Sequence, residues 1–333
     1  MKALWDRMWI LFDMSLHAKS IVSSSGVSIP VLALGTFEPG PASIGRCATA
    51  VKEGILAGYR HIDTAALYGC EEEVGEGIRD SRIRREDLVV CTKFWQQYHQ
   101  PEDVARSLAD SLRRMKLDYV DLYLMHWPLA FKRTENYDVL TGADGKPVVD
   151  HELTQNHEPT WRAMEALVRS GKTRAIGVSN FTIPQLDKLL SFADIKPACN
   201  QVEAHPWFPQ NDLLEFCKEK GIVFAAYSPL GSQPGALHIV KARLLDDEDV
   251  VAVAKKNSVE PAQVLIAWAI QRGTVVIPKS TTPSRIAANY MVPNLSTEDF
   301  KTIDEICLRS PSKKHRFVNF DAVWGVLQFG EDR

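Results

Sequence analysis

Four polar side chains capable of acid and base chemistry stand at the ends of short apolar runs. Asp63 and Tyr68 lie five positions apart in HIDTAALYG, Lys93 lies near the end of LVVCTKF, and His126 follows YVDLYLM. A tyrosine has an ordinary pKa of about 10, and a nearby ammonium lowers that pKa by stabilising the phenolate. We expect Lys93 to act on Tyr68 in this way, with Asp63 keeping Lys93 charged.

We expect His126 to hydrogen-bond a substrate oxygen beside this tyrosine. A proton donor next to an oxygen-binding pocket is what the reduction of a carbonyl to an alcohol requires. The hydride for such a reduction has to come from a cofactor. The segment VGEGIRD at 74–80 lacks the third glycine of a dinucleotide-binding G-x-G-x-x-G turn and follows a helical pattern, so a Rossmann mode is disfavoured. Loops must therefore hold the cofactor.

The elements that position these residues alternate between short β-like runs and amphipathic helices. One such helix is predicted over 100–117, and Pro101 marks its start. This alternation predicts a parallel sheet, and eight units of this length predict a (β/α)8 barrel, the TIM barrel, rather than a doubly wound sheet. Residues 21–36, with Gly26 at the turn, predict an N-terminal β-hairpin. The strand candidates are 60–65, 88–94, 119–127, 173–180, 198–205, 222–228 and 274–280, with a weaker eighth near 289–295.

Composition narrows the class of protein. The 333 residues are 45% hydrophobic with a formal net charge of −3, and the basic residues are scattered, which disfavours nucleic-acid binding. The six cysteines form no C-x-x-C pair, so we expect a reducing, cytoplasmic location. Residues 1–20 predict a poorly ordered N-terminal extension, too interrupted by charge to span a membrane, before a single domain at 21–333.

Seven ordered motifs across the chain carry a family resemblance. HIDTAALYG, CTKFW, LYLMHWP, AIGVSNF, NQVEAHP, YSPLG and IPKS resemble the motif series of the aldo-keto reductase superfamily over roughly residues 21 to 330. The chain is most similar to the branch of aldose and xylose reductases and glycerol dehydrogenases, and above all to its fungal members. The resemblance implies a (β/α)8 barrel with a C-terminal tail over its mouth, and the catalytic tetrad Asp63, Tyr68, Lys93 and His126.

In that tetrad Tyr68 would be the general acid in reduction and the general base in oxidation. The resemblance also implies a nicotinamide cofactor, and two cations with a hydroxyl near the adenosine favour NADPH while NAD stays possible. Ala288, where the family usually has Glu or Gln, bears on that preference. The implied cofactor-binding residues are Thr36, Asp63, Ser179, Asn180, Gln201, Tyr227, Ser228, Leu230, Ser232, Pro278, Lys279, Ser280, Thr282, Arg285 and Asn289. The implied substrate pocket contains Phe37, Trp95 and Trp127, with the aromatic tail 316–330 as a further wall.

Three functions remain open at this stage. The first is NADPH-dependent reduction of aldehydes or ketones related to sugars and small polyols. The second is the same chemistry run mainly as a polyol or glycerol dehydrogenase. The third, from another class, is a nicotinamide-sensing binding protein with incidental turnover. We expect a monomer or dimer. We also expect no metal site, because Glu203 and His205 lack a second converging cluster and suit a structural role.

Overall fold

Eight parallel strands form a barrel in the computed structural model, which describes residues 16, 19–38, 45–231 and 242–329. The hydrogen-bonded order runs from β10 through β9, β8, β7, β6, β5 and β4 to β3. Parallel bridges from Leu32 to Val276 and from Gly35 to Lys279 join β3 to β10 and close the ring. The strands are β3 Leu34–Gly35, β4 His61–Asp63, β5 Val89–Phe94, β6 Val120–Met125, β7 Thr173–Ser179, β8 Cys199–Glu203, β9 Val223–Tyr227 and β10 Val275–Ile277.

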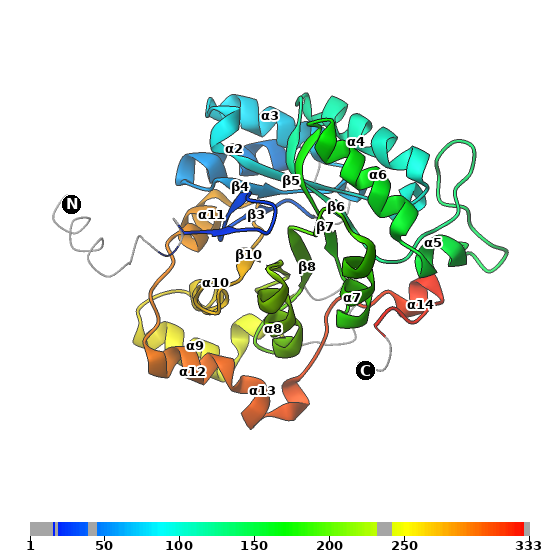
Figure 1. Ribbon diagram of the computed structural model, residues 1–333. Coiled ribbons are helices and arrows are strands. Elements are labelled where there is room, and N and C mark those ends of the chain that lie inside the picture. Colours follow the sequence, from blue (N-terminus) through cyan, green and yellow to red (C-terminus); the bar gives the residue numbers. More distant parts are fainter. Residues whose placement is uncertain (1–15, 17–18, 39–44, 232–241, 330–333) are drawn as a thin grey trace.

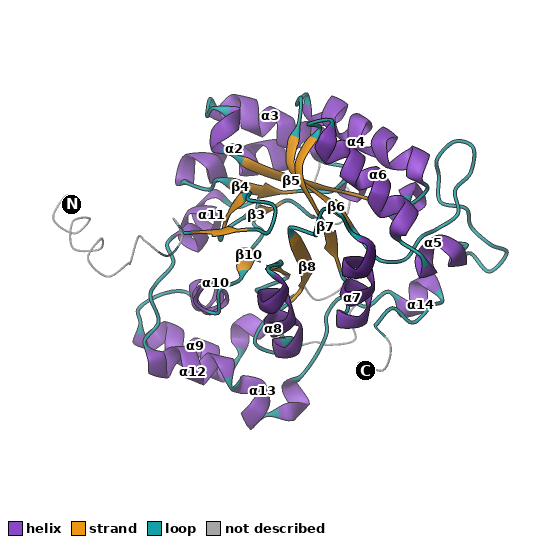
Figure 2. Ribbon diagram, in the orientation of Figure 1, coloured by secondary structure: helices purple, strands orange, loops and turns teal. Residues whose placement is uncertain are grey.

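Helices surround the strands (Figures 1 and 2). Every residue of β6 and all but the first residue of β5 are buried. The predicted barrel is confirmed, and each of the seven stronger strand predictions contains a barrel strand. The helices are α2 Cys47–Ala57, α3 Glu71–Ser81, α4 Pro101–Met115, α5 His151–Gln155, α6 Glu158–Arg169, α7 Ile183–Phe192, α8 Asn211–Lys220, α9 Glu248–Lys256, α10 Pro261–Gln271, α11 Pro283–Tyr290, α12 Thr297–Asp304, α13 Ile306–Arg309 and α14 Asp321–Trp324.

Helix α4 shows how local sequence places an outer helix. Pro101 stands at its first position, where the missing N–H removes no intrahelical hydrogen bond, and two acidic residues follow in the first turn. Val104, Leu108 and Leu112 repeat every four residues and are buried against the barrel. The helix predicted over 100–117 is therefore confirmed.

The eighth strand is not where the sequence pattern placed it. Residues 289–295 hold the end of α11 and a loop, so the strand predicted there is wrong. The missing strand is β3, which directly follows the hairpin of β1 Ser20–Val22 and β2 Ser28–Pro30. The two residues of β3 are too few to show the alternation of apolar and polar residues that marks a strand. Val292 and Leu295 are buried in a loop, and their apolar side chains gave the sequence a strand-like pattern there.

The N-terminal hairpin is confirmed and packs on the apolar interior of the barrel. Gly26 has φ of 80°, a conformation that glycine adopts without strain in a tight turn. Ile29 of β2 is 1% exposed and packs with Leu122, Ala225 and Val275 from three barrel strands. This contact adds Ile29 to the apolar cluster inside the barrel.

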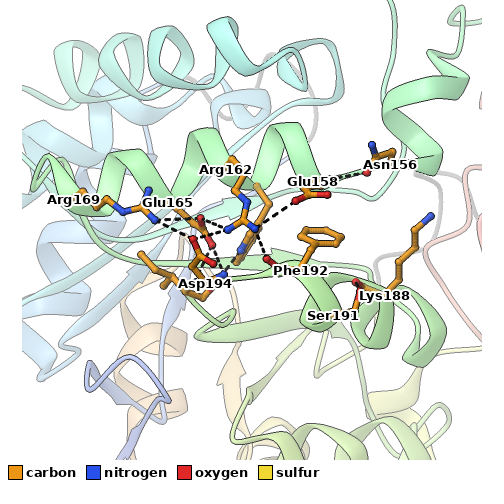
Figure 3. Close-up of polar contacts among 11 residues, drawn as sticks. Asn156, Glu158, Arg162, Glu165, Arg169, Lys188, Ser191, Phe192 and Asp194 are labelled. Carbon is orange, nitrogen blue, oxygen red and sulfur yellow. Dashed lines mark hydrogen bonds and ion pairs between the residues drawn. The ribbon is translucent and has the colours of Figure 1, made fainter.

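A buried carboxylate ties two outer helices together (Figure 3). Glu165 of α6 is fully buried, and its Oε1 accepts hydrogen bonds from the backbone N–H groups of Asp194 at 2.8 Å and Ile195 at 2.9 Å, just after α7. Its Oε2 lies 3.1 Å from Arg162 and 3.4 Å from Arg169. The charge is thus fully paired, and the end of α7 is held against α6.

We expect Glu165→Gln to lower the free energy of unfolding by about 2–3 kcal/mol, because the amide has one acceptor oxygen and its NH2 group would face either the two backbone N–H donors or the two guanidinium groups. The check is the midpoint of urea unfolding followed by fluorescence. Glu158→Gln is the matched control, since the Glu158 side chain on the same helix is 46% exposed and its ion pair is expected to contribute less than about 1 kcal/mol. Equal midpoints for the two variants would contradict the role of Glu165.

Two sequence predictions about the chain ends are not tested by the structure. Residues 1–15 and 17–18 lie outside the described residues, so the division into an extension at 1–20 and a domain at 21–333 stays a prediction. Among the residues that the structure does describe, we find no helix with the length and apolar character needed to cross a membrane.

Candidate active site

The four predicted catalytic residues meet at the carboxyl ends of neighbouring strands. Asp63 is the last residue of β4, Lys93 lies in β5, and His126 directly follows β6. Tyr68 ends the short 3-10 helix η2, Ala66–Tyr68, which follows β4. Because parallel strands in a barrel all end at one face, four residues that are far apart in sequence share one mouth.

Lys93 and Asp63 form a buried ion pair. The Nζ of Lys93 lies 2.7 Å from Oδ1 of Asp63 and donates a second hydrogen bond to the carbonyl oxygen of Thr64 at 2.8 Å. Burial by itself would lower the pKa of Lys93, but the charge and the hydrogen bond of the Asp63 carboxylate favour the ammonium form, and this pKa lies above its ordinary value. Lys93 is therefore an ammonium group at neutral pH.

The ring of Tyr68 lies above this ion pair and beside the imidazole of His126. Its centroid is 5.2 Å from the Nζ of Lys93 and 5.7 Å from the ring of His126. Burial raises the pKa of Tyr68 to about 12, although Lys93 acts in the lowering direction. Lys93 therefore acts on this pKa in the expected direction, and the desolvation of a phenolate outweighs its effect. Tyr68 thus keeps its proton at neutral pH.

His126 is neutral in this environment. Burial, together with the nearby ammonium of Lys93, holds the pKa of His126 well below its ordinary value. Its Nδ1 is buried and finds no hydrogen-bond partner within the described part of the chain. A neutral imidazole next to the phenol can donate one N–H to an oxygen atom without adding a second positive charge to the site.

The residues implied for the nicotinamide end form one hydrogen-bond network with the catalytic pair. Gln201 in β8 donates to Oδ2 of Asp63 at 2.7 Å. Ser179 at the end of β7 donates to the carbonyl oxygen of Gln201 at 2.7 Å, and Asn180 donates to the carbonyl oxygen of His126 at 3.0 Å. The hydroxyl of Tyr227, the last residue of β9, donates to Asn180 at 2.9 Å. The structure therefore brings this predicted group together.

Thr36 completes the same group from the first barrel strand. It follows β3 directly, and its hydroxyl donates to the carbonyl oxygen of Asp63 at 3.0 Å. Asn180 has φ of 65° and Ser228 φ of 49°, so two of these predicted residues adopt the left-handed conformation that is uncommon outside glycine. Such backbone positions tend to occur where a loop is shaped for a ligand.

The residues implied for the adenosine end gather around the junction of β10 and α11. Lys279 and Ser280 follow Pro278 directly after β10, and Ser280 accepts a hydrogen bond from the backbone of Thr282 at 3.1 Å. Arg285 on α11 donates to the hydroxyl of Thr282 at 2.8 Å. Asn289, also implied at this end, is buried on α11. Of the other implied cofactor-binding residues, Ser228 and Leu230 follow β9, and Ser232 lies outside the described residues.

The predicted apolar residues line one side of the mouth. The ring of Phe37 is 5.0 Å from that of Tyr68, and the ring of Trp95 is 5.1 Å from that of His126. Trp127 lies 5.0 Å from Trp324 of the C-terminal tail, which also contacts Trp95. The predicted position of the tail over the barrel mouth is thereby confirmed for the described residues up to 329.

Two carboxylate contacts near the mouth have partners that the sequence did not predict, although a structural role was expected for Glu203. Glu38 lies 3.1 Å from Lys279, and no motif or period marks it. Glu203 at the end of β8 accepts hydrogen bonds from the backbone of Phe317 and Val318, so it anchors the tail. A carboxylate at the end of a fully buried strand is a signal that a partner exists, but the partner lies elsewhere in the chain. We find no three converging His, Cys, Asp or Glu side chains suited to a metal among the described residues.

Taken together, a protonated phenol, a neutral imidazole and a buried ammonium lie at the mouth of a (β/α)8 barrel, so the class is a TIM-barrel protein with acid and base groups at the carboxyl ends of its strands. The chain belongs to the aldo/keto reductase family, whose sequence model matches residues 31–307. It is thus an oxidoreductase by class.

Individual relatives agree with this assignment. The chain is 46% identical over 322 residues to a glycerol 2-dehydrogenase (NADP(+)) of Hypocrea jecorina, covering 95% of this chain and 100% of that protein. It is 45% identical to an aldehyde reductase of Saccharomyces cerevisiae, and the match covers 91% of this chain and 94% of that protein. Among solved structures, the aldose reductase of Schistosoma japonicum is similar with a TM-score of 0.82 and 34% identity, over 95% of this chain and 100% of that one.

Proposed function

We propose that this aldo-keto reductase reduces aldehydes or ketones to alcohols with NADPH, and that Tyr68 is its general acid. The observation that carries the proposal is the buried pair of Lys93 and Asp63 placed against the ring of Tyr68, with the ring of His126 beside it. The names of the fungal relatives, an NADP-dependent glycerol dehydrogenase and an aldehyde reductase, support the cofactor and the substrate class.

The side chains of the mouth have distinct tasks in this proposal. A nicotinamide cofactor, when bound, supplies the hydride. His126 donates its N–H to the carbonyl oxygen and orients it toward the phenol. Tyr68 then gives its proton to the oxygen as negative charge develops there, and the ammonium of Lys93 stabilises the resulting phenolate. In the oxidative direction the phenolate of Tyr68 accepts the same proton.

The donor set at the adenosine end suits a phosphorylated dinucleotide. Lys279 and Arg285 are cations, Ser280 and Thr282 are hydroxyls, and all four lie within seven residues along the junction of β10 and α11. Cations and hydroxyls bind a phosphate dianion more strongly than they bind a neutral ribose hydroxyl. We therefore assign this cluster to a 2′-phosphate, and the network of Ser179, Asn180 and Gln201 to the nicotinamide carboxamide.

We expect Lys279→Ala to weaken NADPH binding by about ten- to hundredfold, because a charge-assisted hydrogen bond is lost. NADH binding should change by less than about twofold, since NADH brings no phosphate to this position. Quenching of tryptophan fluorescence measures both dissociation constants. Lys301→Ala on α12 is the matched control, because the Lys301 side chain is 68% exposed. Equal losses for both cofactors would contradict the assignment of Lys279 to a 2′-phosphate.

The direction of the reaction distinguishes the two enzyme functions. The relative named glycerol 2-dehydrogenase supports alcohol oxidation as a second candidate function with the same residues. A panel of glyceraldehyde, xylose, dihydroxyacetone, hexuronic acids and aromatic aldehydes with NADPH, run beside glycerol and other polyols with NADP, tests both directions. Slow turnover of every compound together with tight NADPH retention would favour a nicotinamide-sensing protein. A cytoplasmic location and a monomeric or dimeric state are part of the proposal.

A further inference from the structure

One acidic residue lies among the basic residues of the adenosine end. Glu38 comes two residues after Thr36, and its Oε2 lies 3.1 Å from the Nζ of Lys279. Its Oε1 lies 2.6 Å from a guanidinium nitrogen of Arg46. The Glu38 side chain is only 19% exposed and that of Lys279 only 24%, so water screens this pair less than a surface pair. A single carboxylate therefore bridges two cations.

Glu38 and Lys279 line the same pocket as Tyr68. Tyr68 and Thr36 line one part of this pocket, and residues 279–281 line another, with Glu38 among the lining residues. Glu38 and Lys279 therefore share one wall with Tyr68. The carboxylate is thus placed to influence what the adenosine end accepts.

The charge of Glu38 acts differently on the two kinds of dinucleotide. A 2′-phosphate next to Lys279 would meet the carboxylate as a like charge, and Lys279 would have to leave Glu38 in order to bind it. An unphosphorylated ribose instead offers hydroxyl donors, which a carboxylate accepts, as acidic residues do in NAD-binding sites of other folds. The carboxylate of Glu38 thus disfavours a 2′-phosphorylated dinucleotide and tolerates an unphosphorylated one.

We propose that Glu38 is a specificity-determining residue that competes with the 2′-phosphate for Lys279 and so reduces the preference for NADPH over NADH. This inference rests on the proposed function, because it assumes that a nicotinamide dinucleotide binds between Tyr68 and Lys279. Arg46 moderates the effect by drawing the carboxylate toward itself. The assignment concerns Glu38 alone and leaves the roles of the catalytic residues unchanged.

The test is Glu38→Gln, which keeps the size of the side chain and removes its charge. We expect the dissociation constant of NADPH to fall roughly fivefold, as for a partly screened ion pair, while that of NADH stays the same or rises. Adenosine 2′,5′-bisphosphate and adenosine 5′-monophosphate probe the same difference without the nicotinamide half. Arg46→Gln should have the opposite effect and weaken NADPH binding, because Glu38 then pairs with Lys279 alone.

A double-mutant cycle separates this effect from a general change in charge. The gain from Glu38→Gln should disappear in the Lys279→Ala background, since the competition needs both partners. Glu72→Gln removes the same charge from an exposed position on α3 and should leave both dissociation constants unchanged. A Glu38→Gln gain that is equal for NADPH and NADH, or that persists without Lys279, would overturn the inference. The inference would also be overturned if Glu38→Gln changed the ratio of the NADPH and NADH dissociation constants by less than about twofold, because a change of roughly fivefold is expected.

Failure of the proposed function gives a different result. If the wild-type chain binds neither NADPH nor NADH, the proposed function is wrong, and the inference is overturned with it. If the wild-type chain binds NADPH and turns over a carbonyl substrate, while Glu38→Gln leaves the cofactor ratio unchanged, only the role of Glu38 is wrong. Direct binding measurements on the wild type therefore come first.

Discussion

Replacement of Tyr68 by phenylalanine is expected to reduce kcat for carbonyl reduction by about 10²- to 10⁴-fold, the range associated with loss of a general acid. The substitution removes only the hydroxyl, because the ring keeps its contacts with Phe37, His126 and Lys93. The dissociation constant of NADPH should stay within about twofold, since the phenol is assigned to the substrate oxygen rather than to the cofactor. Single-turnover absorbance at saturating NADPH measures the chemical step.

Tyr119→Phe is the matched control for this experiment. Tyr119 directly precedes β6 and so lies at the opposite end of the barrel from the mouth, where its exposed hydroxyl accepts a hydrogen bond from Arg174 at 2.9 Å. Its loss should leave kcat unchanged. If Tyr68→Phe retains turnover comparable with the wild type, the proton must come from another group, and the assignment of Tyr68 is wrong.

Glu203→Gln is expected to have the second large effect, on the C-terminal tail. Oε1 of Glu203 accepts hydrogen bonds from the backbone of Phe317 at 2.6 Å and from His205 at 2.9 Å, and Oε2 accepts one from Val318 at 2.8 Å. An amide at this fully buried position cannot accept all three. We expect the free energy of unfolding to fall by about 3–5 kcal/mol, as for other buried charges that lose a partner.

The same substitution should alter substrate binding through the tail. The residues after Val318 bring Phe320 and Trp324 against Trp127 at the mouth. Loosening their anchor should raise KM for the carbonyl substrate and increase hydrogen exchange in residues 315–329, with a smaller effect on the binding of NADPH. Glu215→Gln on α8, with its side chain 68% exposed, serves as the control. Unchanged exchange in the tail would contradict the anchoring role.

The contribution of Glu203 should also depend on pH. Burial by itself would raise the pKa of Glu203, but the hydrogen bonds from His205 and from the tail backbone outweigh it and hold this pKa below its ordinary value. The stabilisation is therefore complete above the unfolded-state pKa of about 4.3 and is lost as the pH falls through the lower folded-state value. The difference in unfolding free energy between the wild type and Glu203→Gln should be largest at neutral pH and shrink in acid.

Most of the fold could be predicted because its signals are local. Seven barrel strands contain apolar runs that end in polar residues, and helices such as α4 carry their own start signals and apolar repeats. The exception is β3, whose two residues show no alternation of apolar and polar side chains. Its partner β10, which closes the barrel, lies far from it along the chain. Closing a barrel is a long-range pairing, so no local pattern reports it.

The sequence by itself determined which side chains are available and, through the strand ends, that Asp63, Tyr68, Lys93 and His126 share one mouth. Only the tertiary structure decided how strongly they act on one another. Burial, rather than the neighbouring ammonium, sets the direction of the Tyr68 pKa, and desolvation depends on every residue packed around the ring. The contacts of Glu38 with Lys279 and of Glu203 with the tail join distant segments. Coulomb and hydrogen-bond energies depend on distance in space, which spacing along the chain does not contain.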